Sequence, residues 1–233
     1  MKRVGIIGGM SWESTRLYYE TINRAVASRL GGLHSADLLI ASPDFAPIAE
    51  MQASGRWDEA GVLLGEIAAN LEAAGADAIA LATNTMHKCA DAIRTRVKAP
   101  LLHIADALGN ALESDDRHQP LLLGTRFTME DDFLRSILRA RGLKVSIPNL
   151  EDRDFVHLSI FKELCRGLVR ERTRARFLEI VEAGARAGVD SVILGCTEIS
   201  MLIAPGGARL PDYDTAQLHA MAIVDFMLGA ETR

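Results

Sequence analysis

The stretch of residues 190–198, which ends in Gly-Cys-Thr-Glu, constrains the fold of this chain most, because most of it occurs twice. The earlier copy covers residues 77–85. In each copy an Ala-Gly pair is followed two residues later by an aspartate, then by an apolar run and by small hydroxyl or thiol residues. Such a run, bounded by turn residues, is typical of an interior strand of a parallel sheet. The polar residues then lie at the carboxyl end of the strand, where open α/β sheets usually bind ligands.

The composition is that of an ordinary globular protein. With 233 residues, 48% hydrophobic and 24% charged, the chain can bury a core as one large α/β domain or two small ones, and the repeat favours two. A net charge of −5 offers no basic surface for nucleic acid. No segment reads as a signal peptide or a membrane span, so a cytoplasmic protein is predicted. Three cysteines without zinc spacing predict neither a disulfide framework nor a metal site.

Strands alternate with helices along the whole chain, which predicts parallel sheets with helices on both faces. Residues 113–119 are the most linker-like stretch, and after them the strand, glycine turn and helix opening of residues 3–11 recur at residues 120–128. We therefore expect two similar doubly wound, flavodoxin- or Rossmann-like halves. Strands are expected at 3–7, 36–41, 77–82, 100–106, 120–124, 144–147, 190–195 and near 209–213. Helices are expected from 12 to 30, 57 to 74, 129 to 140, 155 to 167, 172 to 187, and to 228.

A nucleotide site is disfavoured. The glycines of residues 5–9 do not fit the dinucleotide pattern G-x-G-x-x-G, and no Lys-Ser or Lys-Thr pair of a phosphate-binding loop follows. Met10 and Ser11 are better interpreted as small-molecule contacts or as helix cap and packing. No cofactor is predicted.

Cys196 is the sharpest candidate for chemistry. It follows the second copy of the buried strand and precedes a helix-like segment over 198–203. Backbone N–H groups and a helix dipole in that position lower the pKa of a thiol and favour a reactive thiolate. The alternative is a buried, inert cysteine. Cys89 and Cys165 are expected to pack within helices.

Four segments, in this order and spacing, resemble the aspartate/glutamate racemases, a family of cofactor-independent enzymes: Gly8–Ser11, Thr83–His87, Gly124–Thr128 and Gly195–Glu198. The resemblance covers essentially the whole chain. It implies two α/β halves related by pseudo-two-fold symmetry, an active site between them, and commonly a homodimer. It also implies that the last strand and helix return to the first half, so the expected halves are 1–98 plus 210–233, and 99–209.

The family carries one catalytic cysteine in each half, one removing the α-proton and the other returning a proton. Here the second half supplies Cys196, but the first has Thr83. A hydroxyl is far too weak an acid to ionise near neutral pH without a base, and His87 is only a nearby candidate. A symmetrical two-thiol mechanism is therefore in doubt.

The resemblance also implies the substrate contacts. Neutral donors for the substrate carboxylate would be Asn84, Thr85 and Thr197, and the other contacts would be Met10, Ser11, Gln52, Thr125, Thr128 and Glu198. A basic residue near Gln52 would hold the distal carboxylate in enzymes acting on aspartate, so the glutamine leaves side-chain specificity open. Glu198 either orients a group at the site or stabilises the first turn of a helix. The remaining histidines have no metal-ligand spacing and are predicted to be structural or on the surface: His34, His103, His118, His157 and His219.

Three functions stay open from the sequence. The first is an amino-acid racemase, for aspartate or glutamate. The second is a decarboxylase or cis-trans isomerase of small dicarboxylic acids, in which one cysteine can suffice. The third is a non-catalytic protein that binds such a small molecule.

Overall fold

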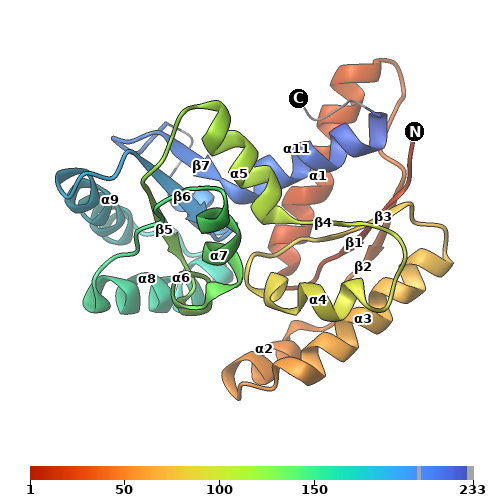
Figure 1. Ribbon diagram of the computed structural model, residues 1–233, viewed down its shortest axis with the longest axis horizontal. Coiled ribbons are helices and arrows are strands. Elements are labelled where there is room, and N and C mark those ends of the chain that lie inside the picture. Colours follow the sequence, from red (N-terminus) through yellow and green to blue (C-terminus); the bar gives the residue numbers. More distant parts are fainter. Residues whose placement is uncertain (204–205, 230–233) are drawn as a thin grey trace. The chain divides into compact units, whose positions relative to one another are not determined.

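The computed structural model describes residues 1–203 and 206–229 of the chain (Figure 1). It is a mixed α/β structure with two separate parallel sheets, of four and three strands. The chain divides into two compact units, Met1–Ile104 with His219–Arg233, and Ala105–Leu218. The predicted fold class, α/β with parallel sheets, is confirmed.

The first unit is built on a sheet of order β2-β1-β3-β4. The strands are β1 (Val4–Ile7), β2 (Leu38–Ala41), β3 (Ala78–Leu81) and β4 (Leu101–Leu102). From β1 the chain moves outward to β2 and then returns to β3 on the other side. Because the strand order reverses between β1 and β3, their carboxyl ends flank the position where open α/β sheets bind ligands.

Helices cover both faces of this sheet. Figure 1 shows α2, α3 and α4 along one side and α1 with α11 along the other. The bounds are α1 (Trp12–Leu30), α2 (Phe45–Ala53), α3 (Trp57–Ala73), the 3₁₀ helix η1 (Thr85–Cys89), α4 (Ala90–Arg94) and α11 (Thr215–Leu228). Buried side chains of α3, including Leu64 and Ala68, form one hydrophobic cluster with Ile79 and Leu81 of β3. Burial of this apolar surface is the main force that fixes the layers.

The second unit is built on a sheet of order β5-β6-β7. The strands are β5 (Pro120–Gly124), β6 (Ser191–Gly195) and β7 (Asp212–Asp214), and β5 and β6 are buried along their full length. The helices are α5 (Ile104–Ser114), α6 (Arg126–Glu130), α7 (Asp132–Ala140), α8 (Leu150–Lys162), η2 (Leu164–Arg166), α9 (Glu171–Arg186) and α10 (Ile199–Leu202). Continuous apolar strands of this kind are expected where both faces of a parallel sheet are covered.

The ends of the two expected halves need correction. The strand β4 pairs with β3 in the first sheet, although the sequence analysis placed it in the half 99–209. The strand β7 pairs with β6 in the second sheet, although it was placed with residues 210–233 in the first half. Both differences have the same cause. The sheet to which a strand of two or three residues belongs is decided by the strand with which it pairs, and so short a sequence does not predict that partner.

Several elements also differ from the expected ones. The helix expected from 155 to 167 begins at Leu150 and ends at Lys162, and α5 begins at Ile104 within the stretch 100–106 that was expected as a strand. The strand expected at 144–147 is reduced to an isolated bridge between Leu121 and Ser146. The helix expected from 129 to 140 is interrupted at Asp131, whose ψ of 153° is extended, so that α6 ends and α7 begins there.

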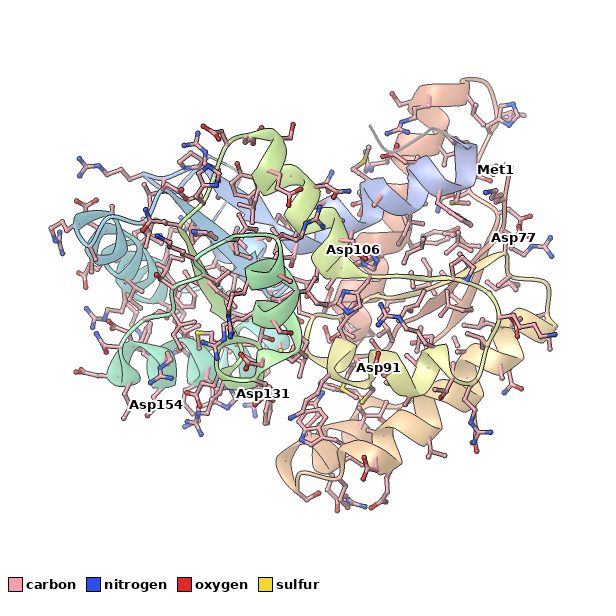
Figure 2. All side chains as sticks on the ribbon, in the orientation of Figure 1. Met1, Asp77, Asp91, Asp106, Asp131 and Asp154 are labelled. Atoms are coloured by element: carbon pink, nitrogen blue, oxygen red, sulfur yellow. The ribbon has the colours of Figure 1, made fainter. Side chains whose placement is uncertain are left out.

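The internal repeat has a structural counterpart before each buried strand. Gly75 and Gly188 both have φ of +93°, a conformation that favours glycine. Two residues later Asp77 accepts a hydrogen bond of 2.6 Å from the backbone N–H of Arg3, and Asp190 accepts one of 2.6 Å from the N–H of His118. Figure 2 shows Asp77 close to Met1, at the amino end of the first sheet. Each aspartate thus ties the entry of one strand to the entry of its neighbour.

We predict that Gly188→Ala destabilises the protein through backbone strain alone. No atom lies within 4 Å of the position that a Cβ would occupy, so no clash is added. An L-residue in the left-handed region costs roughly 1–2 kcal/mol. Urea unfolding should show a decrease of about that size in the free energy of unfolding. An unchanged midpoint would contradict the role assigned to the repeated glycine.

Candidate functional site

In the first unit the polar residues gather where β1 and β3 end. The two strands are in register at Ile7 and Leu81, and Ala82 N–H donates to the Ile7 carbonyl at 2.9 Å. The segments that follow, Gly8–Ser11 and Thr83–Thr85, therefore leave the sheet side by side. A Cβ on Gly8 would lie 2.4 Å from Thr15 Oγ1, so the turn out of β1 requires a glycine.

Ser11 begins helix α1 as its N-cap. Its Oγ accepts from Ser14 N–H at 3.4 Å, and its carbonyl accepts from the Thr15 hydroxyl at 3.1 Å. Ser11 and Met10 are both buried beside the end of β1. The cap predicted from the sequence is confirmed, and Ser11 has a structural role whatever else it contacts.

Gln52 reaches the segment after β3 from helix α2. Its Nε2 donates to Met86 Sδ at 2.8 Å, and the side chain is buried. A thioether is only a weak acceptor. The amide is thus held close to the Thr83–Met86 turn by a contact that a stronger polar partner could replace.

His87 fixes the backbone of the Thr83 turn. Its Nδ1 lies 2.8 Å from the Thr83 carbonyl, and its Nε2 accepts from Ile104 N–H at 3.2 Å. The ring is therefore the neutral tautomer with the proton on Nδ1. Burial, reinforced by His103 and His219, lowers the pKa of His87 well below its usual value. Because both ring nitrogens bind backbone groups, His87 is not the base for the Thr83 hydroxyl that the sequence left open.

Two histidines that are far from His87 in the sequence lie against it. The ring centroid of His103 is 4.4 Å from that of His87, and the centroid of His219 is 5.7 Å away. His219 Nδ1 is 2.9 Å from the Tyr18 hydroxyl, and its Nε2 is 2.9 Å from the Leu102 carbonyl. Both were expected as scattered structural or surface residues. The structure makes them one buried cluster that joins α1, α11 and β4 to the Thr83 turn.

This cluster predicts a loss of stability in acid. Burial lowers the pKa of His103 and of His219 to about 4, below the ordinary value of 6.5. The unfolded chain therefore binds more protons than the folded protein between about pH 6.5 and pH 4, so stability falls as the pH is lowered through that window. In His103→Gln the decrease in urea midpoint between pH 7 and pH 4.5 should be smaller than in the wild type. Equal decreases in the two proteins would contradict the claim that burial keeps His103 neutral.

In the second unit the matching residues follow β5 and β6. Gly124 and Gly195 are paired in register, and a Cβ on Gly124 would lie 2.9 Å from the Gly195 carbonyl. Only glycines allow the two backbones this approach. Thr125 then caps α6, with its Oγ1 accepting from Thr128 N–H at 3.2 Å and lying 3.1 Å from Thr128 Oγ1. Thr125 and Cys196 thus stand one residue beyond a paired glycine on neighbouring strands.

A buried carboxylate lies beside the Cys196 thiol. Glu198 Oε2 accepts from Cys196 Sγ at 2.9 Å and from Thr197 Oγ1 at 2.6 Å. The exposed fraction is 8% for Cys196 and 4% for Glu198, so the pair has little contact with water. Of the two roles considered for Glu198, orienting a neighbouring group is the one that these bonds support.

The expected lowering of the pKa of Cys196 is wrong for this structure. Burial, and then the charge of Glu198, raise that pKa well above its usual value. Helix α10 has only four residues and starts at Ile199, so the dipole expected to favour a thiolate is too short to compete. Cys196 is a protonated thiol that donates to a carboxylate.

Cys165 is a neighbour of this pair that the sequence did not indicate. It lies in η2, and its Sγ donates to Glu198 Oε1 at 3.7 Å. Burial and Glu198 raise its pKa, so it too is a thiol. The two cysteines are 31 positions apart (196 − 165), and no local pattern links them.

In the part of the chain that the structure describes, no group of three or more His, Cys, Asp or Glu is placed to hold a metal ion. None of the helices described combines the length and the apolar character needed to cross a membrane.

In each unit small polar residues follow paired parallel strands, where open α/β sheets usually bind small molecules, and in the second unit they include a thiol beside a carboxylate. The chain belongs to the Asp/Glu/hydantoin racemase family, whose sequence profile matches residues 7–223. Membership of this family supports a racemase, which is an isomerase, as the class of enzyme.

Solved structures agree with this assignment. The chain is 44% identical to a proposed Asp/Glu racemase from Yersinia pestis, with 98% of this chain and 100% of that one covered and a TM-score of 0.92. It is 32% identical to an aspartate racemase homologue from Pyrococcus horikoshii OT3, with 98% and 100% covered and a TM-score of 0.84. The Picrophilus torridus aspartate racemase shares the fold, at 22% identity, 97% and 94% coverage and a TM-score of 0.80.

Proposed function

We propose that this protein is a cofactor-independent racemase of aspartate or glutamate, in which Cys196 exchanges the α-proton. The observation that carries the proposal is the buried hydrogen bond of 2.9 Å from Cys196 Sγ to Glu198 Oε2. Family membership supports the racemase class, and the names of the similar structures support an acidic amino acid as the substrate.

Proton transfer within this pair supplies the reactive thiolate. The Cys196 S–H proton moves to Glu198 Oε2, and the thiolate then takes the α-proton and becomes a thiol again. The electron pair of the C–H bond stays on the substrate, which becomes a carbanion. A pair that shares one proton needs no thiolate in the resting enzyme, which fits the raised pKa of Cys196.

Thr83 takes the position where the family carries its second cysteine. Its hydroxyl, or a water that it holds, would donate the proton that completes inversion. Water would then reprotonate this group, and the hydroxide formed would take the proton that Glu198 received from Cys196, so that the pair returns to its resting state. Since the ring nitrogens of His87 bind the Thr83 carbonyl and the Ile104 N–H, the hydroxyl has no basic help from that ring. Removal of an α-proton is therefore far harder at Thr83 than at Cys196.

Neutral donors would hold the substrate carboxylates. We assign this role to Asn84, Thr85 and Thr197, and assign further contacts to Met10, Ser11, Gln52, Thr125 and Thr128. What supports these assignments is their place: within each unit they lie in the segments that follow parallel strands, except Gln52, which reaches such a segment from α2. Gln52 would contact the distal group of the substrate through the amide that now donates to Met86.

One set of measurements distinguishes the racemase from a decarboxylase and from a non-catalytic binding protein. A panel of amino acids incubated in deuterated water should show α-deuterium incorporation with aspartate or glutamate. Carbon dioxide release from a malonate-like acid would indicate a decarboxylase, and binding without exchange would indicate a binding protein. Independence from cofactors, a homodimeric state and a cytoplasmic location, all implied by the resemblance or expected from the sequence, stay predictions.

The role of Cys196 predicts a large effect of its replacement. Cys196→Ser should lower α-proton exchange at least about a hundredfold, because a serine hydroxyl does not ionise beside Glu198. Exchange is measured by proton NMR in deuterated water, and the circular dichroism spectrum should stay that of the wild type. The matched control is Cys89→Ala, a buried cysteine that lies in the hydrophobic cluster under α3. Undiminished exchange in Cys196→Ser would rule out the assignment.

The identity of residue 83 predicts unequal treatment of the two enantiomers. Only a thiol and a much weaker hydroxyl acid are available, so wild-type exchange should be faster for the enantiomer whose α-proton meets Cys196. Thr83→Cys should raise exchange of the slower enantiomer more than that of the faster one, since a thiol is about a few per cent ionised near pH 7. Each pure enantiomer is assayed at saturation. Equal wild-type rates, unaltered by the mutation, would mean that Thr83 does not occupy the second catalytic position.

A further inference from the structure

We propose that Cys165 is a positioning residue, which sets the proton affinity of the Cys196–Glu198 pair by donating to the far oxygen of the Glu198 carboxylate. This inference rests on the proposed function for its meaning in catalysis. The effect of the Cys165 thiol on the Cys196 thiol through Glu198 does not depend on whether the protein is a racemase.

The contacts divide the Glu198 carboxylate between two parts of the unit. Oε2 accepts from Cys196 and Thr197, which follow β6, at 2.9 Å and 2.6 Å. Oε1 accepts from Cys165 at 3.7 Å, from η2. Rotation of the carboxylate that improved one set of bonds would break the other. The two elements together fix its orientation.

The position of Cys165 is itself well anchored. Leu164, its neighbour in η2, is completely buried. Glu163, which precedes η2, accepts from the Thr173 hydroxyl of α9 at 2.6 Å and lies 3.2 Å from Arg170. These contacts hold η2 against α9, so the Cys165 thiol faces Glu198 from a fixed backbone.

The effect of the Cys165 thiol on Glu198 follows from the fact that the thiol is protonated and uncharged. Burial, then Glu198 and then Cys165 raise the pKa of Cys196, and burial and then Glu198 raise the pKa of Cys165. A neutral S–H donor stabilises a carboxylate more than a carboxylic acid. Cys165 therefore opposes transfer of the Cys196 proton to Glu198, and without it Glu198 would take that proton more readily and the Cys196 thiolate would be more populated.

The test measures the Cys196 thiolate directly and does not depend on turnover. Iodoacetamide is applied between pH 7 and pH 9, and alkylation is followed by mass spectrometry on the tryptic peptide of residues 187–209, which contains no other cysteine. Cys165→Ala should speed alkylation of Cys196 about three- to tenfold at each pH, the size expected from loss of one weak hydrogen bond. Cys165→Ser keeps a donor and should alkylate within about twofold of the wild type.

Two controls separate the donor from packing. Cys165→Val fills the volume of the thiol without its proton and should behave like Cys165→Ala, and it replaces that variant if circular dichroism shows Cys165→Ala unfolded. In a Glu198→Gln background, Cys165→Ala should have no further effect, because the carboxylate through which it acts is gone.

The results that overturn the proposal differ from those that overturn the proposed function. Slower or wild-type alkylation in Cys165→Ala, or an equal change of rate in the Ala and Ser variants, would show that Cys165 does not act as a donor to Glu198. Absence of α-proton exchange by the wild type with every amino acid tested would reject the racemase and leave the alkylation result intact. Wild-type exchange together with an unchanged alkylation rate in Cys165→Ala would reject the positioning role alone.

Discussion

Parallel pairing of neighbouring strands places the candidate site residues of both units, those that follow β1 and β3 and those that follow β5 and β6. Parallel strands end at the same edge of a sheet, so residues that follow two paired strands are brought together however far apart they are in sequence. The register of Ile7 with Leu81, and of Gly124 with Gly195, does this in each unit. Gly124 and Gly195 place no side chains at this edge of the second sheet. The side chains there come from the residues that follow them, and Cys196 is one of these.

The chemistry proposed for the second unit depends on a thiol and a carboxylate that share a buried proton. A separated thiolate would be destabilised here by burial and by the neighbouring negative charge, as the raised pKa of Cys196 indicates. A proton that moves between Sγ and Oε2 avoids building a second charge in the same place. The proposed reaction therefore needs Glu198 as well as Cys196, with Cys165 acting through Glu198, and the hydroxyl of Thr83 would make it unequal for the two enantiomers.

The sequence predicted what depends on local pattern and missed what depends on distant contacts. The repeated apolar run and its preceding glycine and aspartate predicted β3, β6 and the polar residues at their ends, because these signals lie within one short stretch. The sheet to which β4 and β7 belong depends on pairing with a distant strand. The contact of Cys165 with Glu198, and the cluster around His87, join elements that no sequence period relates. The ionisation of Cys196 was predicted wrongly because its sign depends on burial.

The measurement that tests this account most directly is α-deuterium exchange of aspartate and glutamate by Glu198→Gln. A glutamine keeps the size of the side chain and can still orient a neighbour, but it cannot take the Cys196 proton. Exchange should fall by about a hundredfold or more, as expected for loss of a general base, while the fold is kept. Wild-type exchange in this variant would contradict the claim that the thiol and the carboxylate work as one proton-sharing pair.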